Sequence, residues 1–560
     1  MLTFSQVDRA YNVEFLPLCQ ISPASTPDVA ALLGKNGALR ALPASASTRY
    51  PGRIMAADLL LAIDQGTTGT TSLVMDTRGT TLGRSTHEFR QHFPEPGLVE
   101  HDAEEIWQSV IAAVKGALVA ADVGGARIAA IGITNQRETT LVWDRATGKP
   151  IHRAIVWQDR RTSARCAELR AAGHEDVVEA TTGLVLDPYF SGTKVAWILD
   201  HVPGARARAE RGELCFGTID SFLVWRLSGD AAGGAPVHVT DVTNASRTLL
   251  MRLTTLDWDD AMLALIDIPR AMLPKIVGSA ERIAATRGFP GLPDGVPITG
   301  IAGDQQAALF GQACFGVGDA KCTYGTGAFI LANIGSQPIR SRFGLLTTVA
   351  WKVGDEVAFA LEGSAFVAGA AVQWLRDGLG LIKNAVDIEA LAATVPTSGG
   401  VSFVPALSGL GAPYWDPEAR GVICGITRGT TAAHLARATL EGVALEVNDL
   451  LSAMSDDLGK PLARMRVDGG AAANDLLMQF QSDIGPITIE RPTELESTAR
   501  GAAMLAGVGV GLFSSIAEAA GMSRVDRAFQ VAMSADDRAE HRRRWSDAIA
   551  RTRSAPASKA

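Results

Sequence analysis

A strand–turn–strand pattern rich in glycine and threonine occurs twice in the chain, and it constrains the fold more than any other feature. The first copy reads LLLAIDQGTTGTTSLVM from residue 59, and the second reads DAKCTYGTGAFILANIG from residue 319. In each copy two apolar, β-rich runs flank a short turn, which predicts a β-hairpin. Because the same design starts again in the second half of the chain, an internal duplication of an α/β unit is the economical interpretation.

The length supports a division into two large domains. A chain of 560 residues is too long for one typical hydrophobic core. We predict one domain over residues 58–311 and a second over 312–535. Residues 1–57 are expected to be a disordered extension, with Met55 as an alternative start of translation, and residues 536–560 a charged tail formed by a solvated helix and a frayed end.

Composition favours an enzyme that acts on small molecules. Apolar residues make up 47% of the chain, charged residues 20%, and the formal net charge is -8. This balance leaves no basic surplus for nucleic acid or anionic lipid. No apolar run is long enough to span a bilayer, and the N-terminal segment carries charges where a signal peptide needs apolar residues. The six cysteines are scattered, as expected of a reducing compartment, so we expect a cytoplasmic protein without membrane insertion or nucleic-acid partner.

Polar side chains follow two buried strands where each strand ends. Arg137 and Glu138 end the strand that begins IAAIGITN, and Asp304 ends the strand VPITGIAG. Charged groups at a strand end can bind a polyol, or they can lie in a surface turn. Asp304 can accept a proton from an attacking hydroxyl, or it can be a helix N-cap. Trp157 and Tyr189 are either ligand-facing aromatics or core residues.

The glycine-rich turns are candidate phosphate loops. Backbone N–H groups and threonine hydroxyls in such a turn can hold phosphate, and a carboxylate at the strand end can hold Mg²⁺. A single Gly-Thr turn is more often an ordinary hairpin, but two copies can grip a triphosphate from both sides. The run VDGGAAAND, residues 467–475, gives a ligand open access to backbone at a helix N-terminus, although a plain strand-to-helix turn has the same pattern. The chain has neither a GxxxxGK[ST] loop nor a Rossmann fingerprint.

These motifs together resemble the glycerol kinase branch of the FGGY carbohydrate kinase family. The matching segments are DQGTTGTTS, EHDAEEIW, GITNQRETTLVWD, TGLVLDPYFSGTK, GIAGDQQAALFGQ, TYGTGAF, GLGAPYWDPEARG and VDGGAAAND. The resemblance runs from about Leu59 to Leu512. It implies an α/β fold of two actin-like, ribonuclease-H-like domains with the nucleotide and substrate cleft between them. The implied reaction is ATP-dependent phosphorylation of glycerol to sn-glycerol 3-phosphate with release of ADP, the first step of glycerol catabolism.

The resemblance also implies roles for individual residues and for partners. It implies that Asp304 is the catalytic base and that Asp64 lies near Mg²⁺. The implied glycerol contacts are Arg137, Glu138, Tyr189, Asp304 and Gln305, with Trp157 and Phe329 as an apolar wall. The implied ATP contacts are Thr67, Thr68 and Gly69 in the first turn, Thr326 and Gly327 in the second, and Gly369, Gln373, Gly470 and Asn474 elsewhere. A homo-oligomer, dimer or tetramer, is implied as well.

Two segments depart from the family pattern, and two other functions stay open. Thr71 stands where many of the resembling enzymes have an arginine that contacts nucleotide phosphates. The loop GFPGLPDGVPITG lacks the Gly-Thr-Arg stretch with which resembling bacterial enzymes bind fructose 1,6-bisphosphate, so regulation by that sugar phosphate does not follow from the resemblance. The alternatives are a kinase of the same fold for another polyol or ketose, such as erythritol or xylulose, and a non-transferring ATPase or nucleotide-dependent scaffold.

Overall fold

The computed structural model describes residues 57–229, 235–494 and 496–554. The predicted extension at residues 1–57 lies outside these ranges except for Ala57, and so does Met55. The described residues belong to one compact unit, which spans Met55–Ala560.

The first predicted hairpin opens a five-stranded arrangement in the N-terminal half. It is formed by β1 (Leu59–Gln65) and β2 (Gly69–Met75), which pair antiparallel. β2 pairs antiparallel with β3 (Thr81–Glu88), while β1 pairs parallel with β6 (Ile128–Asn135). β6 in turn pairs parallel with β15 (Pro297–Gly303), which gives the order β3-β2-β1-β6-β15.

The second predicted hairpin opens the same arrangement in the C-terminal half. β16 (Asp319–Tyr324) and β17 (Ala328–Gly335) pair antiparallel, and β17 pairs antiparallel with β19 (Glu356–Ala365). β16 pairs parallel with β22 (Arg464–Asp468), and β22 pairs parallel with β23 (Thr488–Pro492). The order β19-β17-β16-β22-β23 repeats the first half strand for strand and sense for sense, which confirms the internal duplication and the ribonuclease-H-like fold class.

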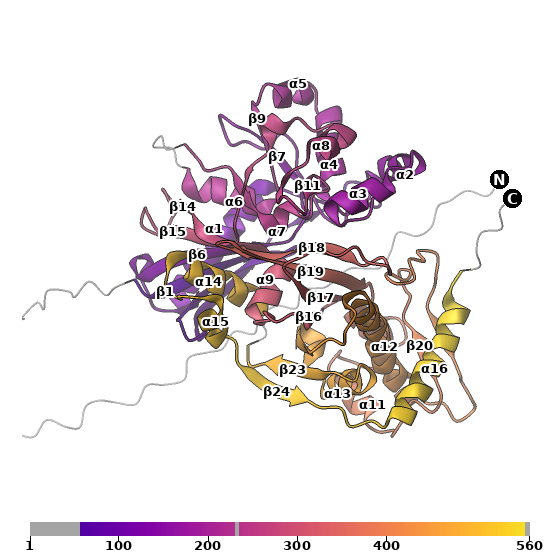
Figure 1. The fold of residues 1–560 in the computed structure, drawn as a ribbon. Helices are drawn as coiled ribbons and strands as arrows, with labels where there is room; N and C mark the ends of the chain where they lie inside the picture. Colours follow the sequence, from indigo (N-terminus) through magenta and orange to yellow (C-terminus); the bar gives the residue numbers. More distant parts are fainter. Residues whose placement is uncertain (1–56, 230–234, 495, 555–560) are drawn as a thin grey trace, which may run out of the picture. The chain divides into compact units, whose positions relative to one another are not determined.

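One continuous sheet of 13 strands contains both arrangements. Between them lie β14 (Ala280–Ala285) and β18 (Leu346–Val353), which pair through Ala280 and Val353. The outermost strand of the C-terminal half is β24 (Val525–Phe529), antiparallel to β23. Figure 1 shows the sheet crossing the molecule from β1 and β6 to β16. The strand ends of both halves therefore belong to a single framework.

Two helices from distant parts of the sequence pack together on one side of this sheet. They are α9 (Asp304–Gly311) and α14 (Ser497–Val510), and α14 also covers β1, β6 and β15 although it follows the strands of the second half (Figure 1). A Cβ atom on Gly501 would lie only 1.8 Å from the carbonyl oxygen of Ala307. The small residues of α14 thus allow backbone-to-backbone contact with α9.

A long segment between β6 and β15 lies on the other side of the sheet and later supplies side chains to the site (Figure 1). Its helices are α2 (Ser163–Ala171), α3 (Glu175–Thr182), α4 (Ser191–His201), α5 (Ala205–Glu210), α6 (Ile219–Ser228), α7 (Val242–Ala245) and α8 (Asp260–Ile266). Its strands are β7 (Leu141–Asp144), β8 (Ala154–Ile155), β9 (Leu214–Gly217), β10 (Val239–Asp241), β11 (Met251–Arg252), β12 (Asp257–Trp258) and β13 (Lys275–Val277).

The remaining elements follow the sequence patterns closely. α1 (Ala103–Ala120) begins after Asp102, whose carboxylate accepts hydrogen bonds from the backbone of Glu104 and Glu105. The others are β4 (Gln91–His92), β5 (Glu100–His101), α10 (Gly369–Asp377), α11 (Asp387–Ala392), β20 (Ser402–Val404), β21 (Val422–Cys424), α12 (Ala432–Leu458), α13 (Asp475–Ile484) and α15 (Ile516–Ala519). None of the described helices combines the length and apolar character needed to cross a membrane.

The C-terminal helix is docked rather than free. It is α16 (Ala535–Thr552), and its charged residues cover one face while Trp545, Ala548 and Ile549 are buried. The Trp545 indole N–H donates a 2.6 Å hydrogen bond to Asp449 on α12. The prediction of a solvated helix therefore describes only one of its faces.

We predict that Gly501→Ala lowers the free energy of unfolding by about 1–3 kcal/mol, because the added methyl group would force two backbones apart. Chemical denaturation checks this. Gly124→Ala is the matched control, since Gly124 has φ -80° and open space around a Cβ atom. Equal stability of the two variants would show that α9 and α14 separate without cost.

Candidate active site

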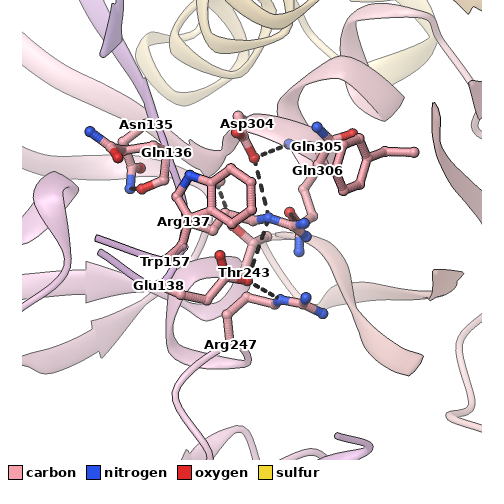
Figure 2. A network of polar contacts seen from close by, with 12 residues as sticks. Asn135, Gln136, Arg137, Glu138, Trp157, Thr243, Arg247, Asp304, Gln305 and Gln306 are labelled. Carbon is pink, nitrogen blue, oxygen red and sulfur yellow. Dashed lines mark hydrogen bonds and ion pairs between the residues drawn. The ribbon is translucent and has the colours of Figure 1, made fainter. Parts of the chain in front are cut away.

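The polar residues that follow β6 are buried at the centre of the molecule. Asn135, Gln136, Arg137 and Glu138 are each at most 2% exposed. The backbone N–H of Gln136 donates a 2.8 Å hydrogen bond to the backbone carbonyl at the end of β1. This bond guides the chain beyond the end of β6. Glu138 then adopts φ +60°, a left-handed conformation that is costly for a residue other than glycine and is typical of functional sites. This turn directs both charged side chains into the network shown in Figure 2.

Arg137 is the hub of that network. Its two terminal nitrogens donate hydrogen bonds of 2.6 Å and 2.9 Å to the two carboxylate oxygens of Glu362, in the bidentate geometry that arginine favours. One of them also donates to Gln306 at 3.2 Å, and the other to the Tyr189 hydroxyl at 3.4 Å. The Arg137 Nε lies 3.2 Å from Asp304 Oδ1. The guanidinium is therefore engaged on every side.

Arg247 completes a ring of alternating charges. This side chain is fully buried, and its Nε donates a 2.7 Å hydrogen bond to Glu138 while its Nη2 donates a 3.1 Å hydrogen bond to Glu362. It follows the short helix α7, which is tied to the end of β6 by reciprocal amide hydrogen bonds between Asn135 and Asn244. Arg137 and Arg247 thus share Glu362.

Arg247 and Glu362 were not predicted as site residues, although the sequence around each contains a clue. Glu362 is a lone carboxylate inside the apolar strand segment VAFALEG, and a buried charge of that kind needs a partner. Arg247 lies in the segment DVTNASRT, in which most residues are polar. Neither signal names the partner, because the two residues are far apart in the sequence and meet only through the fold.

The network contains buried charges of both signs. Its cations are Arg137 and Arg247, with Lys321 nearby, and its carboxylates are Glu138, Glu362 and Asp304. Burial raises the pKa of Glu362, but Arg137 and Arg247 outweigh it and hold the pKa at about 2. Burial raises the pKa of Glu138 and of Asp304 above the ordinary range, against the opposing effect of Arg137 on both.

Asp304 is the accessible member of the network. It is the first residue of α9 and follows the N-cap Gly303, and its side chain is 33% exposed. Its Oδ1 accepts a 2.7 Å hydrogen bond from the Gln305 amide. The Gln305 side-chain oxygen accepts a hydrogen bond from Lys321 on β16, so α9 links the network to the second hairpin. Because Gly303 occupies the N-cap position of α9, the N-cap alternative for Asp304 is excluded.

The aromatic residues expected beside a substrate lie next to Arg137. The rings of Trp157 and Tyr189 meet edge-on with centroids 5.6 Å apart. The Trp157 indole N–H donates a 3.0 Å hydrogen bond to the Thr67 hydroxyl in the first glycine-rich turn. Phe329 lies on β17, and its carbonyl accepts a 3.3 Å hydrogen bond from Lys321. A continuous set of contacts therefore runs from the first turn to the second hairpin.

The first turn is tight and carries a carboxylate at its edge. The Gly66 amide donates a 2.9 Å hydrogen bond to the Gly69 carbonyl, while Thr67, Thr68 and Gly69 keep exposed surface. Burial, followed by the charges of Asp304 and Glu496, raises the pKa of Asp64 to about 8. The charge of Asp304 is thus one of the influences on Asp64.

Thr71 lies on β2, shortly after the first turn. Its hydroxyl lies 2.9 Å from that of Thr86 on the neighbouring strand β3. The Thr71 side chain therefore makes a neutral contact with the neighbouring strand of the sheet.

The second turn repeats this geometry and is packed against α10. The Gly325 amide donates a 2.9 Å hydrogen bond to the Gly327 carbonyl, and the Gly369 amide donates a 2.9 Å hydrogen bond back to Gly325. A Cβ atom on Gly369 would lie 2.6 Å from the Gly325 carbonyl oxygen. Thr326 is exposed at the tip, and Gln373 is exposed one turn further along α10.

The third glycine-rich element lies against the same turn. A Cβ atom on Gly469 would lie 2.5 Å from the carbonyl oxygen of Tyr324, which directly precedes the second turn. Gly470 is exposed and has open space around it. Asn474 caps α13 by accepting a 2.8 Å hydrogen bond from Leu477 through its side-chain oxygen. The structure therefore brings the second turn, Gly369 and Gly470 together, whereas the Asn474 oxygen is already used.

The carboxylates of the site suit a cation with few protein ligands better than one bound entirely by protein side chains. Within the described ranges, no three His, Cys, Asp or Glu side chains converge as metal ligands. Mg²⁺ retains several waters and needs only one or two carboxylates beside phosphate oxygens. The carboxylate oxygens of Asp64, whose pKa is raised in part by the charge of Asp304, fit such an ion.

Two family models match the sequence in succession. Residues 59–311 match the N-terminal domain of the FGGY family of carbohydrate kinases, and residues 320–510 match its C-terminal domain. The chain belongs to the FGGY family of carbohydrate kinases. Its repeated strand order is thus the two-domain kinase fold that the sequence motifs led us to expect.

Similar proteins within this family include curated enzymes and solved structures. The chain is 56% identical to the glycerol kinase of Myxococcus xanthus, over 88% of this chain and 99% of that protein, and 55% identical to that of Bordetella parapertussis, over 88% and 96%. The crystal structure of Plasmodium falciparum glycerol kinase with ADP is 36% identical, covers 89% of this chain and 99% of its own, and has a TM-score of 0.83. A xylulose kinase from Rhodospirillum rubrum, 22% identical with a TM-score of 0.77, shares the fold.

We predict that Arg247→Met lowers the free energy of unfolding of this kinase by about 3–5 kcal/mol, because it leaves Glu138 buried without its hydrogen-bonded cation. The control is Arg340→Met, which removes an arginine 53% exposed that pairs with Asp176 and Glu179. Exposed ion pairs contribute little, so this control should unfold almost like the parent. Chemical denaturation followed by tryptophan fluorescence measures both, and equal losses would contradict the account of the network.

Proposed function

We propose that this kinase transfers the γ-phosphate of ATP to a terminal hydroxyl of glycerol, giving sn-glycerol 3-phosphate and ADP. One observation carries the proposal: the carboxylate of Asp304 is accessible, while the arginine beside it is locked by buried partners. That arrangement provides a proton acceptor next to fixed hydrogen-bonding groups, as transfer to a polyol requires. The 55–56% identity to curated glycerol kinases over nearly their whole length supports glycerol as the acceptor.

The glycerol pocket is proposed to lie between Asp304 and the aromatic pair. Arg137, Glu138 and Tyr189 would hydrogen-bond the hydroxyls, with Gln305 and Asp304 on the side of the attacking oxygen. Trp157 and Phe329 would cover the carbon chain. Because Arg137 is held by Glu362, its orientation is set before glycerol arrives, and this preorganisation lets it discriminate the two ends of the triol.

The nucleotide is proposed to bind across the two glycine-rich turns. Thr67, Thr68 and Gly69 would contact the phosphates from one side, and Thr326 and Gly327 from the other. Gly369, Gln373, Gly470 and Asn474 would contact the rest of the nucleotide. The open space at Gly470 and the exposure of Gln373 leave room for a ligand there. Asn474 would use its amide N–H₂, since its oxygen caps α13.

In the proposed mechanism Asp304 accepts the proton of a terminal glycerol hydroxyl as that oxygen attacks the γ-phosphorus in line. Phosphoryl transfer needs little covalent help, so positioning and charge neutralisation supply most of the acceleration. Asp64 would hold Mg²⁺ directly or through water, and the ion would neutralise phosphate charge. The raised pKa of Asp304 suits a group that must take up a proton during the reaction.

The cellular setting is part of the same proposal. The cysteines among the described residues are free, and most are buried, which agrees with a reducing cytoplasm. We extend the proposal to a cytoplasmic homo-oligomer, a dimer or tetramer, as the family resemblance implies. Analytical ultracentrifugation gives the oligomeric state directly.

The test is a coupled assay of the purified full-length chain with ATP, Mg²⁺ and a panel of glycerol, erythritol and xylulose, followed by NMR identification of the product. We expect ADP release that depends on glycerol and a product that is sn-glycerol 3-phosphate. Faster turnover of another polyol or ketose would reassign the substrate. Equal ADP release with and without any acceptor would instead indicate an ATPase.

We predict that Asp304→Asn lowers turnover by about two to four orders of magnitude while glycerol binding stays largely intact, since it removes a general base but keeps the shape. Steady-state kinetics and calorimetric titration with glycerol measure the two quantities. Asp355→Asn, an exposed change between β18 and β19, is the control and should behave like the parent. Turnover of Asp304→Asn within tenfold of the parent would show that another group takes the proton.

A further inference from the structure

Glu362 is an unusual residue for the place it occupies. It lies in the middle of β19, whose neighbours in the sheet at this point are Leu331 and Leu346, and it is 2% exposed. An isolated carboxylate there would carry a large desolvation cost. It is also the one network carboxylate contributed by β19, whereas Arg137 and Glu138 follow β6. A strand of the second structural repeat thus places a negative charge in contact with Arg137, which follows a strand of the first.

The bidentate pair with Glu362 decides which edge of Arg137 faces Asp304. Both terminal nitrogens of the guanidinium are turned toward Glu362. Only Nε is left near Asp304 Oδ1, at 3.2 Å, and near Glu138, at 3.8 Å. Arg247 holds the other side of Glu362 through its own hydrogen bond of 3.1 Å. The carboxylate therefore cannot turn without breaking contacts to two arginines.

Asp304 and Glu362 compete for the terminal donors of Arg137. An arginine binds a carboxylate most strongly through two parallel N–H donors, which are either the two terminal nitrogens or Nε with one of them. Because Glu362 occupies both terminal nitrogens and Nη2 also contacts Tyr189, Asp304 keeps a single contact, to Nε. Without the charge of Glu362, the terminal donors of Arg137 would be free to turn to Asp304 and hold it in a bidentate pair.

We propose that Glu362 is a positioning residue that keeps Arg137 from capturing Asp304, so that the Asp304 carboxylate stays available to accept the proton of the substrate hydroxyl. Arg247 supports it by fixing the Glu362 carboxylate. The inference rests on the proposed function, because it assigns a purpose to Asp304 in the same reaction.

The electrostatics of Asp304 point in the same direction. Burial raises its pKa, Arg137 and Lys321 lower it, and Glu362 raises it. Asp64 near the end of β1 is a further carboxylate whose pKa responds to the charge of Asp304. Removing the charge of Glu362 takes away one raising influence and strengthens the lowering influence of Arg137. The pKa of Asp304 should therefore fall, which makes the carboxylate a weaker base and moves its protonation to lower pH.

The experiment compares the pH dependence of kcat/KM for glycerol in the parent and in Glu362→Gln, which removes the charge and keeps the shape. We expect turnover at neutral pH to fall about 10- to 100-fold, the usual effect of losing a supporting contact to a reacting group. We also expect the acidic limb of the profile to move to lower pH. The matched control is Glu356→Gln, which changes an exposed residue on the same strand β19. It should leave the turnover and the acidic limb of the pH profile as in the parent.

A merely structural role would give a different result. Glu362→Gln would then melt at a lower temperature, but its folded fraction would keep the acidic limb of the parent, and that outcome overturns the proposal. If Glu362→Gln does not fold, Glu362→Asp takes its place, since it keeps the charge but is too short to hold both nitrogens of Arg137 in the same way. For that variant we expect lower turnover and a smaller shift of the acidic limb to lower pH than in Glu362→Gln, because the charge remains while Arg137 is held less firmly. Full parent turnover would overturn the proposal.

Failure of this inference is distinguishable from failure of the proposed function. If the parent and Glu356→Gln do not phosphorylate glycerol, the proposed function is wrong. If both are active and Glu362→Gln matches them in turnover and pH profile, only the role of Glu362 is wrong.

Discussion

The ion pair between Arg137 and Glu362 is the contact on which the organisation of the site depends. It joins the end of a strand from the first structural repeat to the middle of a strand from the second, deep inside a sheet where neither charge is stable alone. Because both partners are buried, the pair holds the orientation of Arg137 before any ligand binds. Asp304, Glu138 and Tyr189 are then arranged around the Arg137 guanidinium, which Glu362 holds in place.

The sheet and two helices make this pair possible. The two halves repeat one strand order, so the carboxyl ends of β1, β16 and β22 carry glycine-rich turns, and that of β6 carries the buried polar residues of the site. The contact between α9 and α14, with Gly501 against Ala307, seats the first residue of α9 beside Arg137. A fold of this kind accounts for why residues so distant in sequence share a site, and why small residues are needed at the helix contact.

Much of the fold could be predicted from the sequence, but only some of the residues that form the buried network of the site. The two hairpins and the strand before Asp304 follow from apolar patterns and turn residues, because these are local properties. The roles of the predicted glycerol and ATP contacts, and the boundary at residue 311, remain predictions. Arg247, Glu362 and Lys321 escaped prediction because nothing local distinguishes a buried charge with a partner from one at the surface. Only the meeting of β6, α7, β16 and β19 supplies those partners.

By itself, the sequence determined that the chain contains two copies of a strand–turn–strand unit, that polar residues follow two buried strands, and that its motifs are those of FGGY kinases. Short-range chemistry suffices for this, since glycine, threonine and apolar alternation act over a few residues. The tertiary structure decided that α14 crosses back to cover the first repeat, that Glu362 reaches Arg137, and that Asp304 keeps an exposed edge. These outcomes depend on packing and on the cost of burying charge, which are settled only when distant segments meet.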